Sequence, residues 1–342
     1  MPDLPEVAAR LMAAGKGLLA IDESTSTANK RFAATGIPQT EEMRRQWREL
    51  IITTPSLGDA ISGVILFDET IRQATSDQVP FIDILNQAGI VIGIKVDKGT
   101  VDLAGHPGET ITEGLDGLRA RLKDYRDMGA QFAKWRAVIT IAEHLPTHAC
   151  LDANAQALAL YAALCQEAGL VPIVEPEVLM DGDHSLERCD EVTSEVLNVV
   201  FAHLRQQDVQ LEGMLLKPNM ILPGLDHAEQ ASAEEIARAT VTCFKRHVPA
   251  AVGGIAFLSG GQTGPEASAR LNAMHTSGMP LPWPLTFSFG RALQEPALDI
   301  WHGDAASSLA AQKALLHRAR LDSAARRGAY TDAMEKEPVS LR

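Results

Sequence analysis

The 342-residue chain lacks the features expected of a membrane protein or a nucleic-acid-binding protein. Its formal charge of −13 argues against nucleic acid or an anionic membrane as the main partner. No apolar stretch reaches the roughly 18 residues that a membrane helix needs. We therefore predict no nucleic-acid partner and no membrane association. A small anionic ligand stays compatible with this charge, because a cleft can be locally cationic.

Cysteine is scarce, and its distribution bears on the cellular compartment. The four cysteines are scattered and form no C-x-x-C pair: Cys150, Cys165, Cys189 and Cys243. The N-terminal stretch MPDLPEVAARLMAAGKG lacks the basic start and long apolar core of a secretory signal. Reduced, buried thiols are the default in the cytoplasm. We therefore expect a cytoplasmic protein.

Several cofactor and catalytic motifs are missing. There is no G-x-G-x-x-G for dinucleotide binding and no G-x-S-x-G elbow for a serine hydrolase. His144 and His148 are four residues apart, but Pro146 lies between them, so they do not share a helix face. The segment 181–184, DGDH, is more typical of a loop with capping aspartates than of a metal site. We see no zinc ligand set and expect no metal.

Instead the sequence contains a recurring short apolar run that ends in a polar or glycine-rich turn. These runs are residues 17–22, 60–66, 90–95, 131–136, 170–175, 211–217, 252–259 and 284–288. Near-continuous apolar runs of this length are typical of strands in a parallel sheet that is buried on both faces.

Amphipathic helical patterns lie between the runs, for example at 40–51, 152–169 and 231–247. The first begins at Thr40 with two glutamates in its first turn, and the second has a possible cap at Asp152. Alternating strands and helices favour an α/β fold, a single (β/α)8 TIM barrel. A doubly wound open sheet is the structural alternative.

The predicted barrel forms one domain over residues 1–342, with a short helix at its N-terminus. Beyond Trp301 a helical stretch runs to about Leu321. The segment 326–342 then loses periodicity and carries many charges. We predict that it is a mobile C-terminal tail.

In such a barrel the active site is built at the C-terminal ends of the strands. The residues at these ends are Asp22, Asp68, Lys95, Lys134 with Arg136, Glu175 with Glu177, Lys217, Ser259 with Gly260, and Ser288 leading to Arg291. One charged strand end is explained by a solvated loop, and a lone lysine by a stem on apolar surface with its ammonium in water. A whole series of polar ends, expected to converge on one mouth, indicates a site.

Two strand ends carry paired charges. Lys134 and Arg136 are two residues apart and face the same side of a strand, with Trp135 opposite. Glu175 and Glu177 share a face in the same way if the strand continues through Pro176. Cross-strand salt bridges explain these residues as well as catalysis does, since structural ion-pair networks also perturb pKa values.

A lysine at the centre of such a site suits imine chemistry. A neutral amine attacks a carbonyl, and the resulting imine acts as an electron sink. Burial and nearby cations both lower a lysine pKa, and Lys217 ends an apolar strand. Glu175 is placed to protonate the departing water, and Asp22 is the candidate base for a departing hydroxyl proton.

Two regions resemble phosphate sites. The loops after the seventh and eighth runs, the usual phosphate site of this fold, contain Ser259, Gly260, Gly261, Ser288, Gly290 and Arg291. A Gly-Gly pair is also typical of an ordinary tight turn. The segment 23–31 contains Ser24, Thr27, Lys30 and Arg31, which Lys95 would assist. A helix start rich in capping hydroxyls explains that segment equally.

These stretches together resemble the class I fructose-bisphosphate aldolase family. The resemblance runs from GKGLLAIDEST (15–25) through GIKVDKG, FAKWR, VPIVEPEVLMDGDH, LLKPNM and FLSGGQ to TFSFGRALQ (286–294), in family order. It implies reversible cleavage of fructose 1,6-bisphosphate to dihydroxyacetone phosphate and glyceraldehyde 3-phosphate, in glycolysis and gluconeogenesis. It also implies a homotetramer that acts on phosphorylated sugar without metal or cofactor.

The resemblance assigns roles to individual residues. Lys217 would form the imine, Glu175 would exchange protons with the carbinolamine, and Lys134 would position the charged intermediates. Asp22 would take the C4 hydroxyl proton, Glu177 would hold the lysine network, and Arg136 would support the site. Ser259, Gly260, Gly290 and Arg291 match the C1-phosphate site, and Ser24, Thr27 and Lys95 match the C6-phosphate region.

The chain also departs from the family. Many relatives end in a tyrosine that assists proton exchange, whereas this chain ends in Ser340-Leu341-Arg342 and its last tyrosine is Tyr330. Sedoheptulose 1,7-bisphosphate and fructose 1-phosphate are alternative substrates. A scaffold or binding role and a transaldolase-like or keto-acid aldolase activity are the competing hypotheses.

Overall fold

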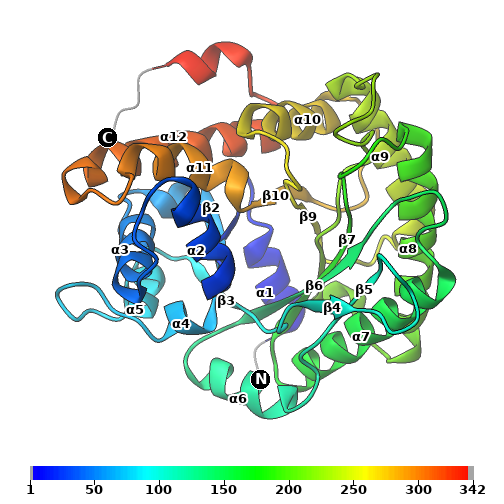
Figure 1. The fold of residues 1–342 in the computed structure, drawn as a ribbon, viewed down its shortest axis with the longest axis horizontal. Helices are drawn as coiled ribbons and strands as arrows, with labels where there is room; N and C mark the ends of the chain where they lie inside the picture. The colour runs from blue at the N-terminus through cyan, green and yellow to red at the C-terminus, as the bar shows by residue number, and fades with distance from the viewer. Residues whose placement is uncertain (1–2, 338–342) are drawn as a thin grey trace.

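Eight parallel strands close into a barrel in the computed structural model, which describes residues 3–337 (Figure 1). In chain order they are β1 (Gly17–Ala20), β2 (Ile61–Leu66), β3 (Val91–Lys95), β6 (Phe132–Ile139), β7 (Val171–Val178), β8 (Leu215–Leu216), β9 (Ile255–Phe257) and β10 (Leu285–Phe289). The first and last strands pair, with Leu18 beside Ser288, and this pairing closes the ring. The predicted (β/α)8 barrel is therefore confirmed, and the open sheet is wrong.

Each strand overlaps one of the predicted apolar runs. Strands β6 and β7 continue past the predicted ends to Ile139 and Val178, so Glu175 and Glu177 do share one face of a strand. Strand β8 is short because Pro218 follows Lys217 and has no N–H to donate to a neighbouring strand.

A two-stranded hairpin that the sequence did not predict covers β6. It pairs β4 (Thr100–Asp102) with β5 (Thr110–Thr112), and the Thr112 hydroxyl donates to the Arg136 carbonyl at 2.7 Å. Its strands are three residues long and β4 is exposed, so no apolar alternation marks them in the sequence.

The helices of the described residues surround the strands, and α1 lies near the centre of the view (Figure 1). They are α1 (Leu4–Leu11), α2 (Thr25–Ala34), α3 (Glu41–Ile52), α4 (Asp68–Ile71), α5 (Phe81–Gln87), α6 (Leu118–Asp127), α7 (His148–Glu167), α8 (Leu186–Gln206), α9 (Ala233–His247), α10 (Gly264–Thr276), α11 (Arg291–Trp301) and α12 (Ser308–Arg326), with short 3-10 segments η1 (Leu57–Asp59), η2 (Leu211–Gly213), η3 (Ala305–Ser307) and η4 (Asp332–Lys336). Within residues 3–337 none of them has the length and apolar character needed to cross a bilayer.

Of the two predicted helix caps, one is confirmed and one is wrong. Thr40 caps α3 as predicted, since its side chain accepts the Met43 N–H. The cap of α7 is Thr147, whose side chain accepts the Cys150 N–H, so the prediction of Asp152 was wrong. Helix α7 therefore begins at His148, before Asp152. Asp152 instead contacts His203 Nε2 on α8 at 2.8 Å.

The barrel interior is apolar at its N-terminal end. Leu18, Phe132, Ile173 and Leu215 belong to a buried cluster that α1 completes from below. A side chain at Gly93 would meet the Phe132 ring at 2.2 Å, so only glycine allows this packing. The apolar layer leaves only the C-terminal end of the barrel for charged side chains.

The C-terminal segment packs on the outside of the barrel. Helix α12 runs to Arg326, past the predicted end, and η4 follows; Arg318 of α12 contacts Glu335 of η4 at 2.6 Å. Residues 338–342 lie outside the described residues. The mobility of 326–342 and the boundaries of one domain over 1–342 stay predictions.

Candidate active site

Three buried charged side chains converge at the C-terminal ends of neighbouring strands. Lys134 on β6, Glu175 on β7 and Lys217 just after β8 are each at most 4% exposed. The strands hold them in register, with Arg136 beside Glu175 and Val174 beside Leu216. Three ionisable groups are thus held close together inside the barrel, where water does not screen their charges.

Lys217 lies against a carboxylate rather than in water. Its Nζ is 3.0 Å from Glu175 Oε1, and its backbone N–H donates to the Val174 carbonyl at 2.8 Å. Leu215 and Leu216 precede it and are fully buried. The alternative of an ammonium that extends into water is therefore wrong.

Lys134 links this pair to the end of β1. Its Nζ lies 2.8 Å from Asp22 Oδ2 and 3.2 Å from Glu175 Oε2. Asp22, Lys134, Glu175 and Lys217 consequently form one continuous chain of alternating charge. Each contact in this chain is short enough for a direct ion pair between the two charged groups.

Burial and neighbouring charges determine which of these side chains are ionised at neutral pH. Burial alone would raise the pKa of Asp22, but the ammonium groups of Lys134 and then Lys217 outweigh burial and lower that pKa to about 2. Burial is likewise outweighed at Glu175, whose pKa is lowered by Lys134, Lys217 and Arg136. Burial would lower the pKa of Lys134, but Asp22 and Glu175 raise it. At neutral pH both carboxyls are therefore ionised and Lys134 is protonated.

Two carboxylates beside the site were missed in the sequence. Asp97 is buried beyond β3, 3.1 Å from Lys95 Nζ and 3.9 Å from Lys134 Nζ. Glu23 follows Asp22 and accepts hydrogen bonds from Arg31 and Arg48 at 2.5 and 2.7 Å. The spacing of Asp97 from Lys95 was the available signal, since residues two apart on an extended strand share a side.

The outer pair of charges lies across the same two strands. Arg136 Nε donates to Glu177 Oε2, and Glu177 is buried while Arg136 is partly exposed. Together with the Lys134–Glu175 contact, this pair shows that the cross-strand salt bridges considered as an alternative do exist. The charged strand ends thus stabilise one another as well as lining the site.

The loops after β9 and β10 lie side by side. Gly260 and Gly261 have φ values of +54° and +104°, which favour glycine. A Cβ placed on Gly261 would lie 3.6 Å from Arg291 Nη2, so the loop meets the start of α11. Ser288 on β10 is buried, and its Oγ has no hydrogen-bond partner within the described residues. Ser259 is also buried.

The second predicted phosphate region, segment 23–31 with Lys95, contains both a helix cap and charged side chains. Ser24 caps α2 by accepting the Thr27 N–H at 3.3 Å, as the capping alternative states. Arg31 is paired with Glu23, Lys30 is exposed, and Lys95 joins the site through Asp97.

Asp68 and Tyr330 lie away from the charged residues of the site. Asp68 contacts Arg72 at 2.8 Å and accepts from the Tyr125 hydroxyl at 2.9 Å, so it does not join the charge chain. Tyr330 is buried, and its hydroxyl donates to Glu335 at 2.8 Å on the outer side of α12. Neither side chain belongs to the site.

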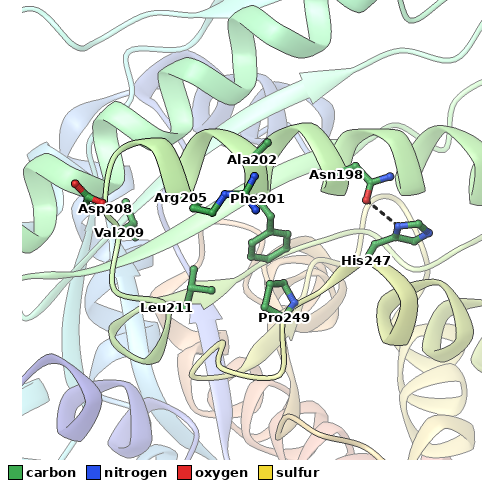
Figure 2. Close-up of a pocket in the computed structure, with 9 residues that line it drawn as sticks. All are labelled: Asn198, Phe201, Ala202, Arg205, Asp208, Val209, Leu211, His247 and Pro249. Carbon is green, nitrogen blue, oxygen red and sulfur yellow. Dashed lines mark hydrogen bonds between the residues drawn. The ribbon is translucent and has the colours of Figure 1, made fainter.

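A pocket in the structure lies away from this site. Within residues 3–337 no group of three or more His, Cys, Asp or Glu side chains is arranged to hold a metal ion. A pocket of about 530 Å³ lies between α8, η2 and the end of α9 (Figure 2). It is lined by Asn198, Phe201, Ala202, Arg205, Asp208, Val209, Leu211, His247 and Pro249, none of which is a candidate catalytic residue.

Comparison with known families shows which family the chain belongs to. The model of the family described as fructose-bisphosphate aldolase class-I matches residues 3–340. The chain belongs to the class I fructose-bisphosphate aldolase family. It is an enzyme, a lyase that cleaves fructose bisphosphate by aldol chemistry. The hypothesis of a transaldolase-like or keto-acid aldolase is therefore wrong.

Relatives of this aldolase cover nearly its whole length. A probable class 1 fructose-bisphosphate aldolase of Xanthomonas campestris pv. campestris is 57% identical over 96% of this chain and 98% of its own. Fructose-bisphosphate aldolase C-A of Danio rerio is 49% identical over 96% of this chain and 91% of its own. The solved structure of the Plasmodium falciparum aldolase, in complex with TRAP and a small-molecule inhibitor, has a TM-score of 0.94 at 45% identity, covering 96% of this chain and 95% of that one.

Proposed function

We propose that this aldolase cleaves fructose 1,6-bisphosphate through an imine between Lys217 and the C2 carbonyl. The observation that carries the proposal is the 3.0 Å contact between Lys217 Nζ and Glu175 Oε1 inside the barrel. An amine and a carboxyl in direct contact, away from water, are the two groups that imine formation requires.

A single proton transfer prepares both groups. When the Lys217 ammonium gives its proton to Glu175, the lysine becomes a neutral nucleophile and Glu175 becomes a carboxylic acid. The amine adds to C2, and Glu175 then protonates the carbinolamine hydroxyl, which leaves as water. The positive charge of Lys134, 3.2 Å from Glu175 Oε2, stabilises the carboxylate that this step restores.

Asp22 acts in the bond-breaking step. Its carboxylate takes the proton of the C4 hydroxyl, the C3–C4 bond breaks, and its electron pair moves onto the iminium to give an enamine. Glyceraldehyde 3-phosphate leaves, and protonation and hydrolysis of the enamine release dihydroxyacetone phosphate. Because its pKa is about 2, Asp22 is ionised and ready to accept this proton at neutral pH. Glu177 and Arg136 hold the neighbouring strand ends in place.

We assign the two phosphates of the substrate to two separate groups of residues. We assign the C1 phosphate to backbone N–H groups and side chains of Ser259, Gly260, Gly261, Ser288, Gly290 and Arg291. We assign the C6 phosphate to Ser24, Thr27, Lys30, Arg31 and Lys95. The positive φ values of Gly260 and Gly261 support the first assignment, because such glycines allow a ligand to approach the backbone closely.

Borohydride trapping tests the proposal directly. The enzyme is mixed with dihydroxyacetone phosphate and EDTA, reduced, and mapped by mass spectrometry. We expect an adduct on Lys217 that is absent in Lys217→Met and retained in Lys123→Met, which changes an exposed lysine on α6. No adduct, or one on another lysine, would mean that the nucleophile is misassigned. An adduct in EDTA also supports a reaction without metal.

Assembly and substrate preference are tested separately. We propose a homotetramer in the cytoplasm; an Arabidopsis thaliana relative named as cytosolic is 52% identical over 92% of this chain and 88% of its own. Light scattering should give four times the 36.8 kDa chain mass. A panel with sedoheptulose 1,7-bisphosphate and fructose 1-phosphate tests the preference for fructose 1,6-bisphosphate.

A further inference from the structure

A buried glutamine connects the start of α11 with the end of β1. Gln294 is 0% exposed. Its amide nitrogen donates to the Ala20 carbonyl at 2.6 Å and to Glu23 Oε1 at 2.8 Å, while its amide oxygen accepts from Trp47 Nε1 at 3.3 Å. Both amide hydrogens are thus used, and a buried group that is bonded on both sides holds a fixed orientation.

These two acceptors lie on either side of Asp22 in the sequence. Ala20 is the last residue of β1, and Glu23 directly follows Asp22. The second Glu23 oxygen accepts from Arg48 at 2.7 Å, so the Glu23 carboxylate is anchored from two sides. The backbone that carries Asp22 is therefore held both before and after this residue.

The same glutamine belongs to the first turn of the helix assigned to the C1 phosphate. Its backbone N–H donates to the Gly290 carbonyl at 3.0 Å, next to Arg291. A Cβ placed on Gly290 would lie 3.5 Å from the Ala20 carbonyl oxygen. The loop after β10 and the end of β1 are consequently packed together, and Gln294 spans them.

We propose that Gln294 is a positioning residue that aligns Asp22 with the phosphate-binding start of α11. It touches no reacting atom, and the inference rests on the roles proposed above for Asp22 and Arg291. The C1 phosphate anchors the substrate, and the Asp22 oxygen must then meet the C4 hydroxyl within hydrogen-bond distance. A displacement of about 1 Å between these two points can cost on the order of 100-fold in rate.

This role predicts an uneven effect on the reaction steps. Imine formation uses Lys217 and Glu175, which Gln294 does not contact. Carbon–carbon cleavage uses Asp22. Loss of the Gln294 amide should therefore slow cleavage while imine formation continues, and it should lower kcat with little change in KM.

The test compares Gln294→Met with Gln312→Met. Gln312 on α12 makes similar bonds, to the Leu50 carbonyl at 3.0 Å and to Thr53 Oγ1 at 3.1 Å, but touches no residue of the site. We expect Gln294→Met to reduce single-turnover cleavage of fructose 1,6-bisphosphate by about 10- to 100-fold. Borohydride trapping of dihydroxyacetone phosphate should stay within about twofold of the wild type, and Gln312→Met should leave both rates unchanged.

Other outcomes would overturn the inference. Cleavage by Gln294→Met at the wild-type rate, or equal loss of cleavage and trapping, would show that Gln294 does not act through Asp22. If that variant does not fold, Trp47→Phe, which removes the donor to the Gln294 oxygen but keeps an aromatic ring beside Trp301, decides in its place. The inference then requires that Trp47→Phe cleaves fructose 1,6-bisphosphate more slowly than the wild type but is trapped normally with dihydroxyacetone phosphate. Failure of trapping in the wild type would instead refute the Lys217 imine itself.

Discussion

Replacing Lys134 by methionine removes the central cation of the charge chain. Lys134 lies 2.8 Å from Asp22, 3.2 Å from Glu175 and 3.9 Å from Asp97. Methionine has a similar length and no charge, so packing changes little. The three carboxylates would then lie close together with less compensation, and we expect the variant to be less stable and nearly inactive.

The size of the effect follows from the Asp22 pKa. Burial raises the Asp22 pKa and the cationic neighbours lower it, and the net shift from 3.8 to about 2 corresponds to roughly 2 kcal/mol in favour of the ionised carboxylate. Breaking a buried ion pair by removing one partner costs about 3–5 kcal/mol, because the remaining charge stays buried. The loss in Lys134→Met should therefore lie between about 2 and 5 kcal/mol at neutral pH.

The pH dependence has a definite sign. In the wild type the folded-state pKa of Asp22 is lowered, so its contribution to stability is complete above about pH 3.8 and disappears as the pH falls toward 2. In Lys134→Met the effect of burial, which raises the pKa values of Asp22 and Glu175, would be less opposed, and protonation would relieve the repulsion between these carboxylates. The stability difference between wild type and variant should therefore decrease from pH 7 to pH 4.

The assay is urea unfolding at pH 7 and pH 4, with Lys123→Met as the matched control. Lys123 contacts Asp127 at 2.6 Å on the exposed face of α6, and such surface pairs contribute about 0.3–0.5 kcal/mol. Equal losses in the two variants, or a loss in Lys134→Met that does not change with pH, would refute this electrostatic account.

Two further predictions concern backbone anchors. Arg326 donates to the Met12 and Ala13 carbonyls, each at 2.5 Å; we expect Arg326→Met to lose about 2–3 kcal/mol in urea unfolding. The exposed Arg327→Met should change by less than about 0.5 kcal/mol, and an equal loss in both would contradict the assignment. Gly261→Ala forces a side chain onto a φ of +104°, so KM for fructose 1,6-bisphosphate should rise about 10-fold. An unchanged KM would remove Gly261 from the phosphate site.

The strand ends of the site were predictable because the signal is local. An apolar run indicates a buried strand, and the charged residue at its end, such as Lys217 or Glu175, marks the C-terminal end of that strand. Once the eight runs were placed in a barrel, their ends had to meet. The observed contacts among Asp22, Lys134, Glu175 and Lys217 follow from that arrangement.

The supporting residues were not predictable, because their roles depend on partners far away in the chain. Gln294 gains its role from Ala20 and Glu23, more than 270 residues earlier. The capping of α7 by Thr147 shows the same limit over a short distance. Both Thr147 and Asp152 are residue types that cap helices well, so residue type alone does not decide between them.

The closure of the barrel by β1 and β10 also bears on synthesis of the protein in the cell. Thr286 on β10 donates to the Lys16 carbonyl, and these residues are 270 positions apart. At 5–20 residues per second, a ribosome needs roughly 15 to 55 s between the two strands. During this time one edge of β1 stays unpaired, and an open strand edge can pair with another chain. Pairing of β1 with β2 covers only the other edge of β1, so the edge that pairs with β10 stays open until the last strand emerges.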